Sequence, residues 1–416
     1  MFEAEPGLFY GLSSRGTDKF GASIFMLTSA GAFQLIHSFQ PFVQSYTLAQ
    51  GANGLLYGAG FTSQDFHHFY FSIQTSGKNV QQYSFPGQWG SAWQTIVVSP
   101  DELADIVAAN PSDGSRVFGY ARIGNNGEMT ILHEFSGDDR VPAGANLVRG
   151  REGIIYGIGT EHSGADTGFI FRLTPGGTSA RLVHFPVPRS GRFPLLAASD
   201  GNLYGLFSAG GANNTGELYR ATPSGIFETA VSFPAKGMVE PQTLMQASDG
   251  NIYGSTNNTY IFGYNLKTRK LASVFRLNPD GSQGLCPCQF IQGTDGKLYG
   301  VAPFGGKYPG IGALFSLDIG LPRPTPVISQ IYPTSGTVGQ AVLLWGTYLL
   351  GATSVSFNGK PATTISVTSG QSVRVTVPAG ATSGLVTIRT ANGAFTTKSE
   401  FRVVSPGVRD SVSSNK

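Results

Sequence analysis

The stretch "ASDGNIYGS", residues Ala247–Ser255, joins an Asp-Gly dipeptide to a short apolar run that ends in tyrosine and glycine. The phrase returns as "ASDGNLYGL" at Ala198–Leu206 and as "GTDGKLYGV" at Gly293–Val301. Asp-Gly between two alternating runs is a strong hairpin signal, because both residues tolerate the positive φ that a tight turn demands. We therefore interpret the phrase as a β-hairpin with a core tyrosine behind its turn, and not as a calcium or nucleotide motif.

The tyrosine of this phrase recurs along the chain with a regular period. Successive copies lie 46 to 49 residues apart, except for one double interval of 99, and they are Tyr10, Tyr57, Tyr156, Tyr204, Tyr253 and Tyr299. Inside the double interval, "DELADIVAAN" offers Ile106 at the place of the tyrosine. An aromatic residue in the next apolar run forms a second marker, at Phe25, Phe71, Phe118, Phe171, Tyr219, Phe262 and Phe315. Both markers predict seven units of about 48 residues.

Each unit reads as four short strands joined by turns. A Gly-rich loop of variable length follows the tyrosine, as at Ser208–Glu217, and a third run such as "FIFRLTPGG" (Phe169–Gly177) ends in a second turn. The fourth run closes on a phenylalanine, at Phe39, Phe85, Phe135, Phe185, Phe233 and Phe275. This pattern predicts an all-β fold in which residues 1–320 form a seven-bladed β-propeller. The recurring rings are expected to fill the space between neighbouring sheets, and the glycines after the tyrosines to relieve crowding.

The amino-acid composition agrees with this fold class and limits the classes of partner that the protein could bind. The chain has 416 residues, enough for two domains, with 57 Gly, 24 Pro, 29 Phe and 16 Tyr but only 13% charged residues. A net charge of +3 does not indicate a nucleic-acid partner or an anionic membrane surface. No apolar run approaches the roughly 18 residues of a membrane-spanning helix, so no membrane span is expected. The start "MFEAEPGLFYG" shows no signal peptide.

The first and seventh units predict an open edge. Met1 already falls in a first strand, whereas unit seven runs only as far as "GALFSLDIG" (Gly312–Gly320), its third strand. We expect the seventh blade to expose an edge that is open to a strand from another chain or from a segment outside this sequence.

A second domain follows the propeller. "LPRPTP", residues 321–326, is a Pro-rich linker, and residues 327–404 alternate apolar and polar residues with a turn signal about every ten residues. This pattern predicts a compact β-sandwich. The polar residues 405–416 are expected to form a flexible tail.

Two resemblances follow from these motifs. The units resemble the GloVer-type tandem repeats of environmental bacteria, through the "DGNLYG" phrase, the Gly-rich loop and the closers "QLIHSF" (Gln34–Phe39) and "TILHEF" (Thr130–Phe135). Residues 327–404 resemble an IPT/TIG domain, an immunoglobulin-like module, through "PVISQIYPTSGTVGQAVLLWG", "VSFNGKPAT" and "VPAGATSGLVTIRT". The resemblance implies a protein that is exported and held at the cell surface.

Candidate binding residues are sparse. Asp65, His67 and His68 in "QDFHHFYF" could bind a metal or act as acid and base, although an irregular polar loop is the simpler interpretation. Asp138 and Asp139 in "SGDDR" could bind a cation or a sugar, and a solvated turn is again simpler. Cys286 and Cys288, spaced as "CPC", are interpreted as small strand residues. No cofactor, metal site or catalytic residue is assigned, because no known catalytic motif is present.

The sequence therefore favours a non-enzymatic extracellular or cell-surface scaffold or adhesion protein. Glycans or surface proteins would bind the propeller loops, since these vary while the strands repeat. The open blade edge or the immunoglobulin-like domain would allow self-assembly into a homo-oligomer or fibre. The alternative is a carbohydrate-active enzyme, a polysaccharide lyase or hydrolase, on a propeller scaffold, by analogy of fold alone.

Overall fold

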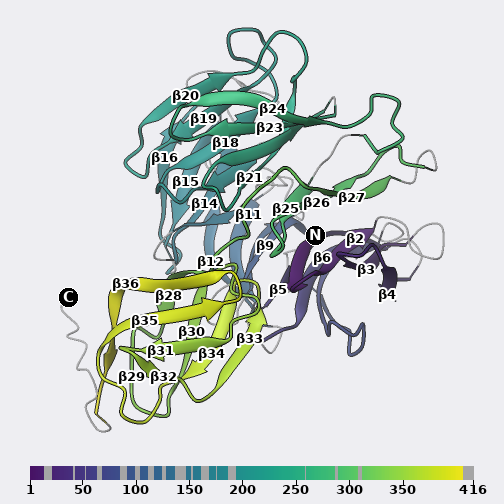
Figure 1. The fold of residues 1–416 in the computed structure, drawn as a ribbon. Coiled ribbons are helices and arrows are strands. Elements are labelled where there is room, and N and C mark those ends of the chain that lie inside the picture. Colours follow the sequence, from purple (N-terminus) through teal and green to yellow (C-terminus); the bar gives the residue numbers. More distant parts are fainter. Residues whose placement is uncertain are drawn as a thin grey trace. The chain divides into compact units, whose positions relative to one another are not determined.

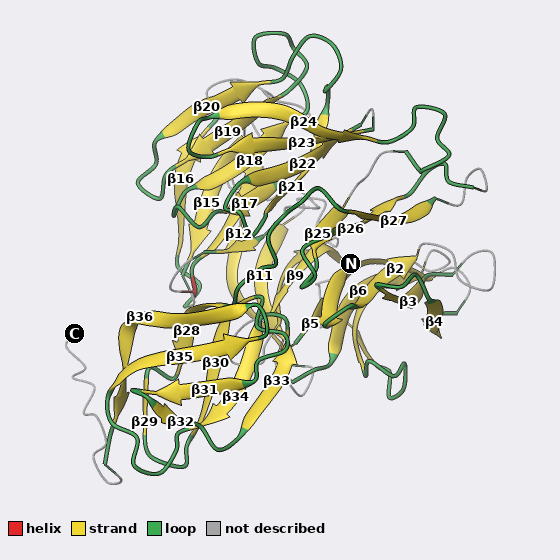
Figure 2. Ribbon diagram, viewed as in Figure 1, coloured by secondary structure: helices red, strands yellow, loops and turns green. Residues whose placement is uncertain are grey.

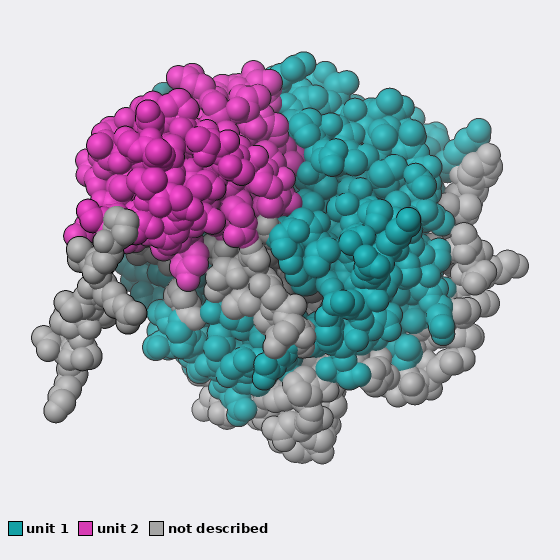
Figure 3. Space-filling view, turned by 90° about the horizontal axis from the view of Figure 1, so that it is seen from below, with its two compact units in different colours: residues 1–324 teal, residues 325–416 magenta. Residues whose placement is uncertain are grey.

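The chain folds into β-strands and connecting loops. The computed structural model describes residues 1–13, 21–40, 43–51, 53–62, 68–84, 91–98, 104–110, 117–123, 128–135, 147–150, 153–160, 168–174, 176–185, 194–257, 259–285, 289–307 and 312–405. Only the backbone is described for residues 44–47, 68, 91–98, 104–110, 117, 118 and 160. No α-helix occurs in these ranges, where strands and loops are interrupted by a single 3₁₀ turn at Gly153 (Figures 1 and 2). The chain divides into two compact units, Met1–Pro324 and Thr325–Lys416 (Figure 3).

Within the first unit the described strands form seven antiparallel sheets, six of four strands and one of three. The first and second sheets contain β1 (Phe2–Glu5), β2 (Leu8–Ser13), β3 (Ser23–Thr28) and β4 (Phe33–Ser38), then β5 (Val43–Gln50), β6 (Leu56–Thr62), β7 (His68–Ile73) and β8 (Gln81–Ser84). The third and fourth contain β9 (Ser91–Val98), β10 (Ala104–Asn110), β11 (Val117–Ile123) and β12 (Met129–Phe135), then β13 (Val148–Arg149), β14 (Ile155–Thr160), β15 (Gly168–Leu173) and β16 (Ser179–His184). The fifth, sixth and seventh contain β17 (Leu195–Ala197), β18 (Leu203–Phe207), β19 (Glu217–Ala221) and β20 (Phe227–Ser232), then β21 (Pro241–Gln246), β22 (Ile252–Thr256), β23 (Tyr260–Asn265) and β24 (Lys270–Arg276), then β25 (Gln289–Gln292), β26 (Leu298–Ala302) and β27 (Ala313–Leu317).

The recurring phrase forms the turn between the first two strands of a sheet. In the fifth sheet the Gly201 N–H donates to the Ala198 carbonyl, and the Ala198 N–H donates to the Asn202 carbonyl. Gly201 has a φ of 87°, whereas Asp200 keeps a negative φ. The turn is therefore a three-residue loop with glycine in the left-handed position, which corrects the expectation that both Asp and Gly adopt positive φ.

The aromatic marker packs across the neighbouring strand. Phe262 on β23 pairs with Gly254 on β22, and a side chain built on Gly254 would overlap the Phe262 ring. The same relation joins Phe171 to Gly157 and Tyr219 to Gly205. The glycine that follows each core tyrosine therefore makes room for the ring of the third strand.

The third sheet departs from the predicted markers. In the first, fourth, fifth and sixth sheets an irregularity between the third and fourth strands falls just before the aromatic marker, as between Ile24 and Phe25. In the third sheet it falls before Ala121, so Ala121 and not Phe118 occupies the marker position. Ala121 pairs with Ile106, which places Asp105 at the tyrosine position in place of Ile106. The predicted marker Phe118 is wrong, because the prediction looked for an aromatic residue and the marker of this sheet, Ala121, is not aromatic.

A similar correction applies to the end of the sixth sheet. The backbone N–H groups of Phe39, Phe185 and Phe233 each donate to a carbonyl at the start of the third strand of their own sheet, either in its first residue or in the residue just before it. In the sixth sheet the Leu277 N–H makes this bond, to the Thr259 carbonyl. The buried Leu277 therefore closes this sheet, and Phe275 lies two residues before the closing position.

Neighbouring sheets pack through shared apolar clusters, and the last sheet packs on the first. Phe9 and Phe25 of the first sheet form one cluster with Tyr299 of the seventh, and the ring centroids of Phe9 and Tyr299 lie 4.2 Å apart. First strands of neighbouring sheets, such as β17 and β21, contact each other, whereas fourth strands such as β8 and β24 are mostly exposed. The sheets thus form a closed ring with first strands inside and fourth strands outside.

The second unit is a two-layer β-sandwich. One sheet has the order β28 (Val327–Tyr332), β30 (Ala341–Thr347), β34 (Ser372–Thr376) and β33 (Ile365–Ser369); the other has β29 (Ser335–Gly336), β36 (Gly393–Val403), β35 (Gly384–Thr390), β31 (Ser354–Phe357) and β32 (Lys360–Pro361). Both sheets contribute to one core, in which Leu344 and Val373 meet Phe357 and Phe401. The sandwich thus has its own hydrophobic core, as an independently folded domain requires.

The start of the expected linker belongs to the first unit. The Pro322 carbonyl accepts hydrogen bonds from Ser248 Oγ at 2.6 Å and from Gln292 Nε2 at 3.0 Å, and Leu321 packs against the cluster between the sixth and seventh sheets. Of the expected tail 405–416, residues 406–416 lie outside the described residues.

Candidate functional site

The ring presents two unlike faces. Strands alternate in direction, so the turns from first to second and from third to fourth strand gather at one face, which we call the turn face. Loops from second to third strand, and those from one sheet to the next, gather at the other, which we call the loop face. The turn face repeats from sheet to sheet. The loop face varies: residues 208–216 join β18 to β19, whereas only 257–259 join β22 to β23.

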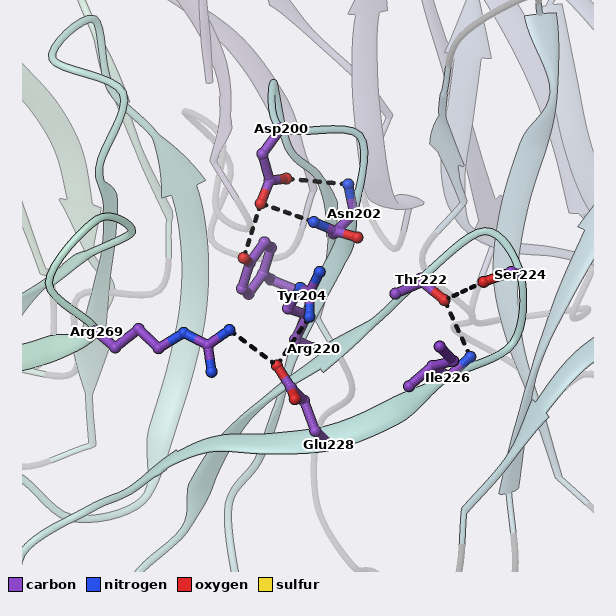
Figure 4. Close-up of polar contacts among 9 residues, drawn as sticks. All are labelled: Asp200, Asn202, Tyr204, Arg220, Thr222, Ser224, Ile226, Glu228 and Arg269. Carbon is purple, nitrogen blue, oxygen red and sulfur yellow. Dashed lines mark hydrogen bonds and ion pairs between the residues drawn. The ribbon is translucent and has the colours of Figure 1, made fainter.

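On the turn face, each carboxylate of the recurring phrase binds within its own turn. Asp200 Oδ1 accepts from the Asn202 N–H at 3.0 Å, and Asp200 Oδ2 accepts from Tyr204 Oη at 2.9 Å (Figure 4). Asp249 with Tyr253, and Asp295 with Tyr299, repeat the tyrosine contact at 2.8 Å. These aspartates hold the core tyrosine of the sheet and fix the turn.

A charged row continues outward from this turn in the fifth sheet. Arg220 on β19 pairs with Glu228 on β20 at 2.9 Å, and Arg269 from the β23–β24 turn lies 3.6 Å from the same carboxylate (Figure 4). Burial by itself would raise the pKa of Asp200, but hydrogen bonds from Asn202 and Tyr204 and the charge of Arg220 outweigh it and hold that pKa below its ordinary value. These ion pairs link the fifth sheet to the sixth, and Arg220 and Arg269 both face the Glu228 carboxylate.

Glutamine side chains bridge adjacent sheets beside these turns. Gln246 Oε1 accepts from the Ser199 N–H at 2.8 Å while its Nε2 donates to Ser199 Oγ at 3.0 Å. Gln292 makes the same two contacts with Ser248, at 2.8 and 2.9 Å. Each bridge joins residues 44 to 47 positions apart, so it reports contact between neighbouring repeats.

A carboxylate takes the glutamine position where the ring closes. Glu3 accepts from the Thr294 N–H at 2.8 Å, from Thr294 Oγ1 at 2.9 Å and from the Gly7 N–H at 2.7 Å. Burial raises the pKa of Glu3 despite these hydrogen bonds. Residues 291 positions apart are thereby joined by the same kind of bridge that joins neighbouring repeats.

On the loop face, residues 208–216 form an anchored loop. Asn213 Nδ2 and Thr215 Oγ1 both donate to the Phe233 carbonyl, at 2.9 and 3.0 Å. The Ala212 N–H donates to Ser232 Oγ at 3.0 Å, and the Gly210 N–H to Asn214 Oδ1 at 2.9 Å. This loop is a defined, polar and exposed surface at the end of the fifth sheet.

Three non-glycine residues with positive φ lie in this loop or close to it. Asn214, Glu240 and Thr259 have φ values of 52°, 52° and 79°. The Glu240 N–H donates to the Thr215 carbonyl at 2.9 Å, and Asn257 Nδ2 donates to Glu240 Oε2 at 2.8 Å. A positive φ is least tolerated by a β-branched residue such as Thr259, and such conformations concentrate at functional sites. We therefore take the loop face of the fifth and sixth sheets as the candidate site.

Most of the candidate residues predicted from sequence cannot be compared with this site. Asp65, His67, Asp138, Asp139, Cys286 and Cys288 lie outside the described residues. His68 begins β7, where its backbone pairs with Phe61. Asn214 and Thr259 fall within the unspecific Asn-x-Thr tripeptides that begin at Asn213 and Asn257, and no sequence motif marks Glu240. These tripeptides and the variable loop length were the signals that could have pointed to this face.

Within the described ranges, no three His, Cys, Asp or Glu side chains are placed to hold a metal ion together. Those ranges also contain no helix of the length and apolarity needed to cross a membrane.

Fold and site together define an all-β protein built from a tandem repeat whose loops vary on one face. Two stretches, residues 107–263 and 193–382, match the model of the Gloeobacter/Verrucomicrobia repeat and together span more than half of the chain. The protein belongs to this repeat family, which confirms the resemblance drawn from the repeating phrase. No curated protein matches the sequence.

Solved structures similar to the chain show the kind of fold. A streptogramin B lyase is 13% identical with a TM-score of 0.50, covering 76% of this chain and 95% of its own. A putative 6-phosphogluconolactonase from Bacteroides uniformis is 15% identical with a TM-score of 0.51, covering 76% and 98%. A puromycin hydrolase is 14% identical with a TM-score of 0.53, covering 82% and 58%. The likeness at this identity concerns the fold alone, which is β-propeller-like.

Proposed function

We propose that residues 1–320 form a seven-bladed β-propeller, that residues 327–404 form an immunoglobulin-like module of the IPT/TIG kind, and that the protein is a non-enzymatic binding scaffold outside the cell or at its surface. The propeller would bind glycans or surface proteins through the loop face. The open edge of the seventh sheet or the immunoglobulin-like module would supply contacts between copies.

The contrast between the two faces carries this proposal. On the turn face, recurring polar side chains such as Asp200 and Gln246 bind turns and neighbouring sheets, so they maintain the scaffold. On the loop face, the length of the loops changes from sheet to sheet, since residues 208–216 join β18 to β19 and only residues 257–259 join β22 to β23. A constant scaffold with one variable face is the usual arrangement of repeat proteins that bind partners.

A matched pair of substitutions separates the two faces. Ala212 lies exposed in the anchored loop and Ser224 lies exposed in a turn of the opposite face. We expect Ala212→Arg to weaken binding of the full chain to an immobilised panel of bacterial and plant polysaccharides, whereas Ser224→Arg leaves binding unchanged. Both variants should unfold at the temperature of the wild type. Equal losses in the two variants would contradict a loop-face site.

The same panel tests the enzymatic alternative. The similar structures are those of a lyase, a hydrolase and a putative lactonase, but at 13 to 15% identity they support the fold only. We expect the wild-type chain to leave each polysaccharide at its original length. Release of new reducing or unsaturated ends by the purified chain would overturn the scaffold proposal in favour of a carbohydrate-active enzyme.

A further inference from the structure

The seventh sheet differs from the other six at its outer edge. Every other sheet of the first unit has a fourth strand, such as β24, paired to its third. In the seventh sheet, β27 (Ala313–Leu317) is the outermost described strand (Figure 1). An edge strand presents unpaired backbone N–H and C=O groups at alternate residues. In the described part of the chain, no strand occupies this position.

Burial at the edge shows what a fourth strand would cover. The marker residue of the third strand is at most 3% exposed in Phe25, Phe71, Phe171, Tyr219 and Phe262. The equivalent Phe315 is only partly buried, and Ser316 beside it is exposed. Leu314, on the other face of β27, is partly buried against the cluster that closes the ring. The aromatic side chain of Phe315 is therefore only partly covered, whereas its equivalents in the four-stranded sheets are buried.

The edge also lacks the features that usually prevent strand addition. Exposed edges are normally protected by charged residues, proline or a bulge. The sequence of β27 is "ALFSL", with none of the charged residues or prolines, and its pairing with β26 (Leu298–Ala302) is regular over all five residues. Such an edge can accept an extended chain by backbone hydrogen bonding.

We propose that the outer edge of β27 is a strand-acceptor site, which binds an extended segment of another polypeptide as the fourth, antiparallel strand of the seventh sheet. This inference deepens the role proposed above for the open edge of the seventh sheet, rests on β27, and does not depend on the loop-face function.

The six complete sheets define the chemistry of the occupant. In the fourth sheet, Ala180 pairs with Arg172, Arg181 with Phe171 and Val183 with Ile170, with an irregularity after Arg181. Val183 is 4% exposed, so this position requires an apolar residue, whereas Arg181 is exposed. By the shared register, Phe171 corresponds to Phe315. The partner is thus an extended segment with alternating polar and apolar residues, without proline in its interior.

A peptide from the chain itself provides the probe. The sequence of residues 178–185, "TSARLVHF", includes the fourth strand of the fourth sheet. Bound to β27 in the same register, its Ala180 position would face Ser316, since Ser316 pairs with Tyr299 as Arg172 pairs with Tyr156. Directly opposed residues of antiparallel strands lie about 4.5–5.5 Å apart at Cα, within the range that a disulfide spans.

Register-specific disulfide trapping is the first test. The full chain carries Ser316→Cys, with both native cysteines changed to serine, and the peptide carries Ala180→Cys or, as the matched control, Arg181→Cys. We expect trapping through Ala180→Cys to exceed that through Arg181→Cys by about tenfold, because alternate side chains point to opposite faces of a sheet. Equal trapping by the two peptides, or none, would overturn the proposal.

Hydrogen exchange on the unmodified full chain provides an independent second test. We expect the amides of β27 that point away from β26 to exchange quickly in the free chain and about tenfold more slowly with the unsubstituted peptide, while amides of β23 (Tyr260–Asn265), which already has a fourth-strand neighbour, stay unchanged. A peptide with Leu182→Pro should give no slowing, because proline removes a backbone donor. Protection of these outward-facing amides of β27 in the free chain would show that its own residues cover the edge and would overturn the proposal.

Discussion

At the residue scale, the marker position of the fifth sheet carries an unusual hydroxyl. Tyr219 occupies the position that phenylalanine fills in Phe25, Phe71, Phe171, Phe262 and Phe315. Its side chain is fully buried, and its Oη has no hydrogen-bond partner among the described residues. Burial raises the pKa of Tyr219 well above its ordinary value, so the group stays neutral. A buried polar group without a partner lowers stability.

We predict that Tyr219→Phe stabilises the chain by about 1 kcal/mol, because it removes the unsatisfied hydroxyl and keeps the ring. Tyr204→Phe is the matched control. It removes the hydrogen bond to Asp200 and should cost about 1.5–3 kcal/mol. Urea unfolding of the two variants measures both changes, and a loss of stability in Tyr219→Phe would show that its hydroxyl has a partner.

Thr259 is the second residue whose local conformation is costly. It combines a φ of 79° with a side-chain oxygen that is buried and has no hydrogen-bond partner among the described residues. Glycine adopts positive φ without strain, so Thr259→Gly should raise the free energy of unfolding by about 1 kcal/mol. Thermal unfolding tests this expectation. If the variant is less stable, the threonine side chain contributes packing that outweighs its strain.

At the scale of the element, much of a sheet could be predicted from the sequence. The repeating phrase placed the hairpin turns, and the tyrosine marker placed the second strands, since both depend on contacts within a few residues. The third sheet was misaligned because its marker, Ala121, is not aromatic. The bridges made by Gln246 and Gln292 were missed, because their partners lie 47 and 44 residues away. The left-handed φ of Thr259 had no sequence signal, since glycine and asparagine are the residues expected there.

The glycine behind each core tyrosine leads to a prediction about sheet packing. A side chain on Gly254 would meet both the Phe262 ring and the Thr243 carbonyl, whereas one on Gly176 would meet only Thr174 Oγ1 at 4.0 Å, an ordinary van der Waals contact. Gly254→Ala should destabilise the chain by about 1–3 kcal/mol through overpacking, and Gly176→Ala should be nearly neutral. Chemical denaturation compares the two, and similar effects would argue against the tight approach of the third strand to the second.

At the scale of the whole molecule, ring closure depends on a buried carboxylate. The folded pKa of Glu3 is raised above 4.5, mainly by burial. The folded state therefore binds this proton more tightly than the unfolded state does. The contribution of Glu3 to stability is fully present below pH 4.5 and is lost as the pH rises through the folded pKa.

We predict that Glu3→Gln gains stability relative to the wild type as the pH rises from below 4.5 to neutral. Asp200→Asn should show the opposite trend. The folded pKa of Asp200 is lowered, so its contribution is present above its ordinary value of 3.8 and is lost as the pH falls. Urea unfolding across this pH range measures both trends. Parallel curves for wild type and Glu3→Gln would mean that burial does not perturb this carboxyl.

The closed ring itself is the central claim, and the contact between Glu3 and Thr294 tests it most directly. A double-mutant cycle with Glu3→Ala and Thr294→Val measures their coupling, with Ser248→Ala and Gln292→Ala as the reference bridge between neighbouring repeats. A closed ring predicts a coupling of about 0.5–3 kcal/mol in both cycles. Additive effects of Glu3 and Thr294, alongside coupling in the reference cycle, would show that the first and seventh sheets do not meet.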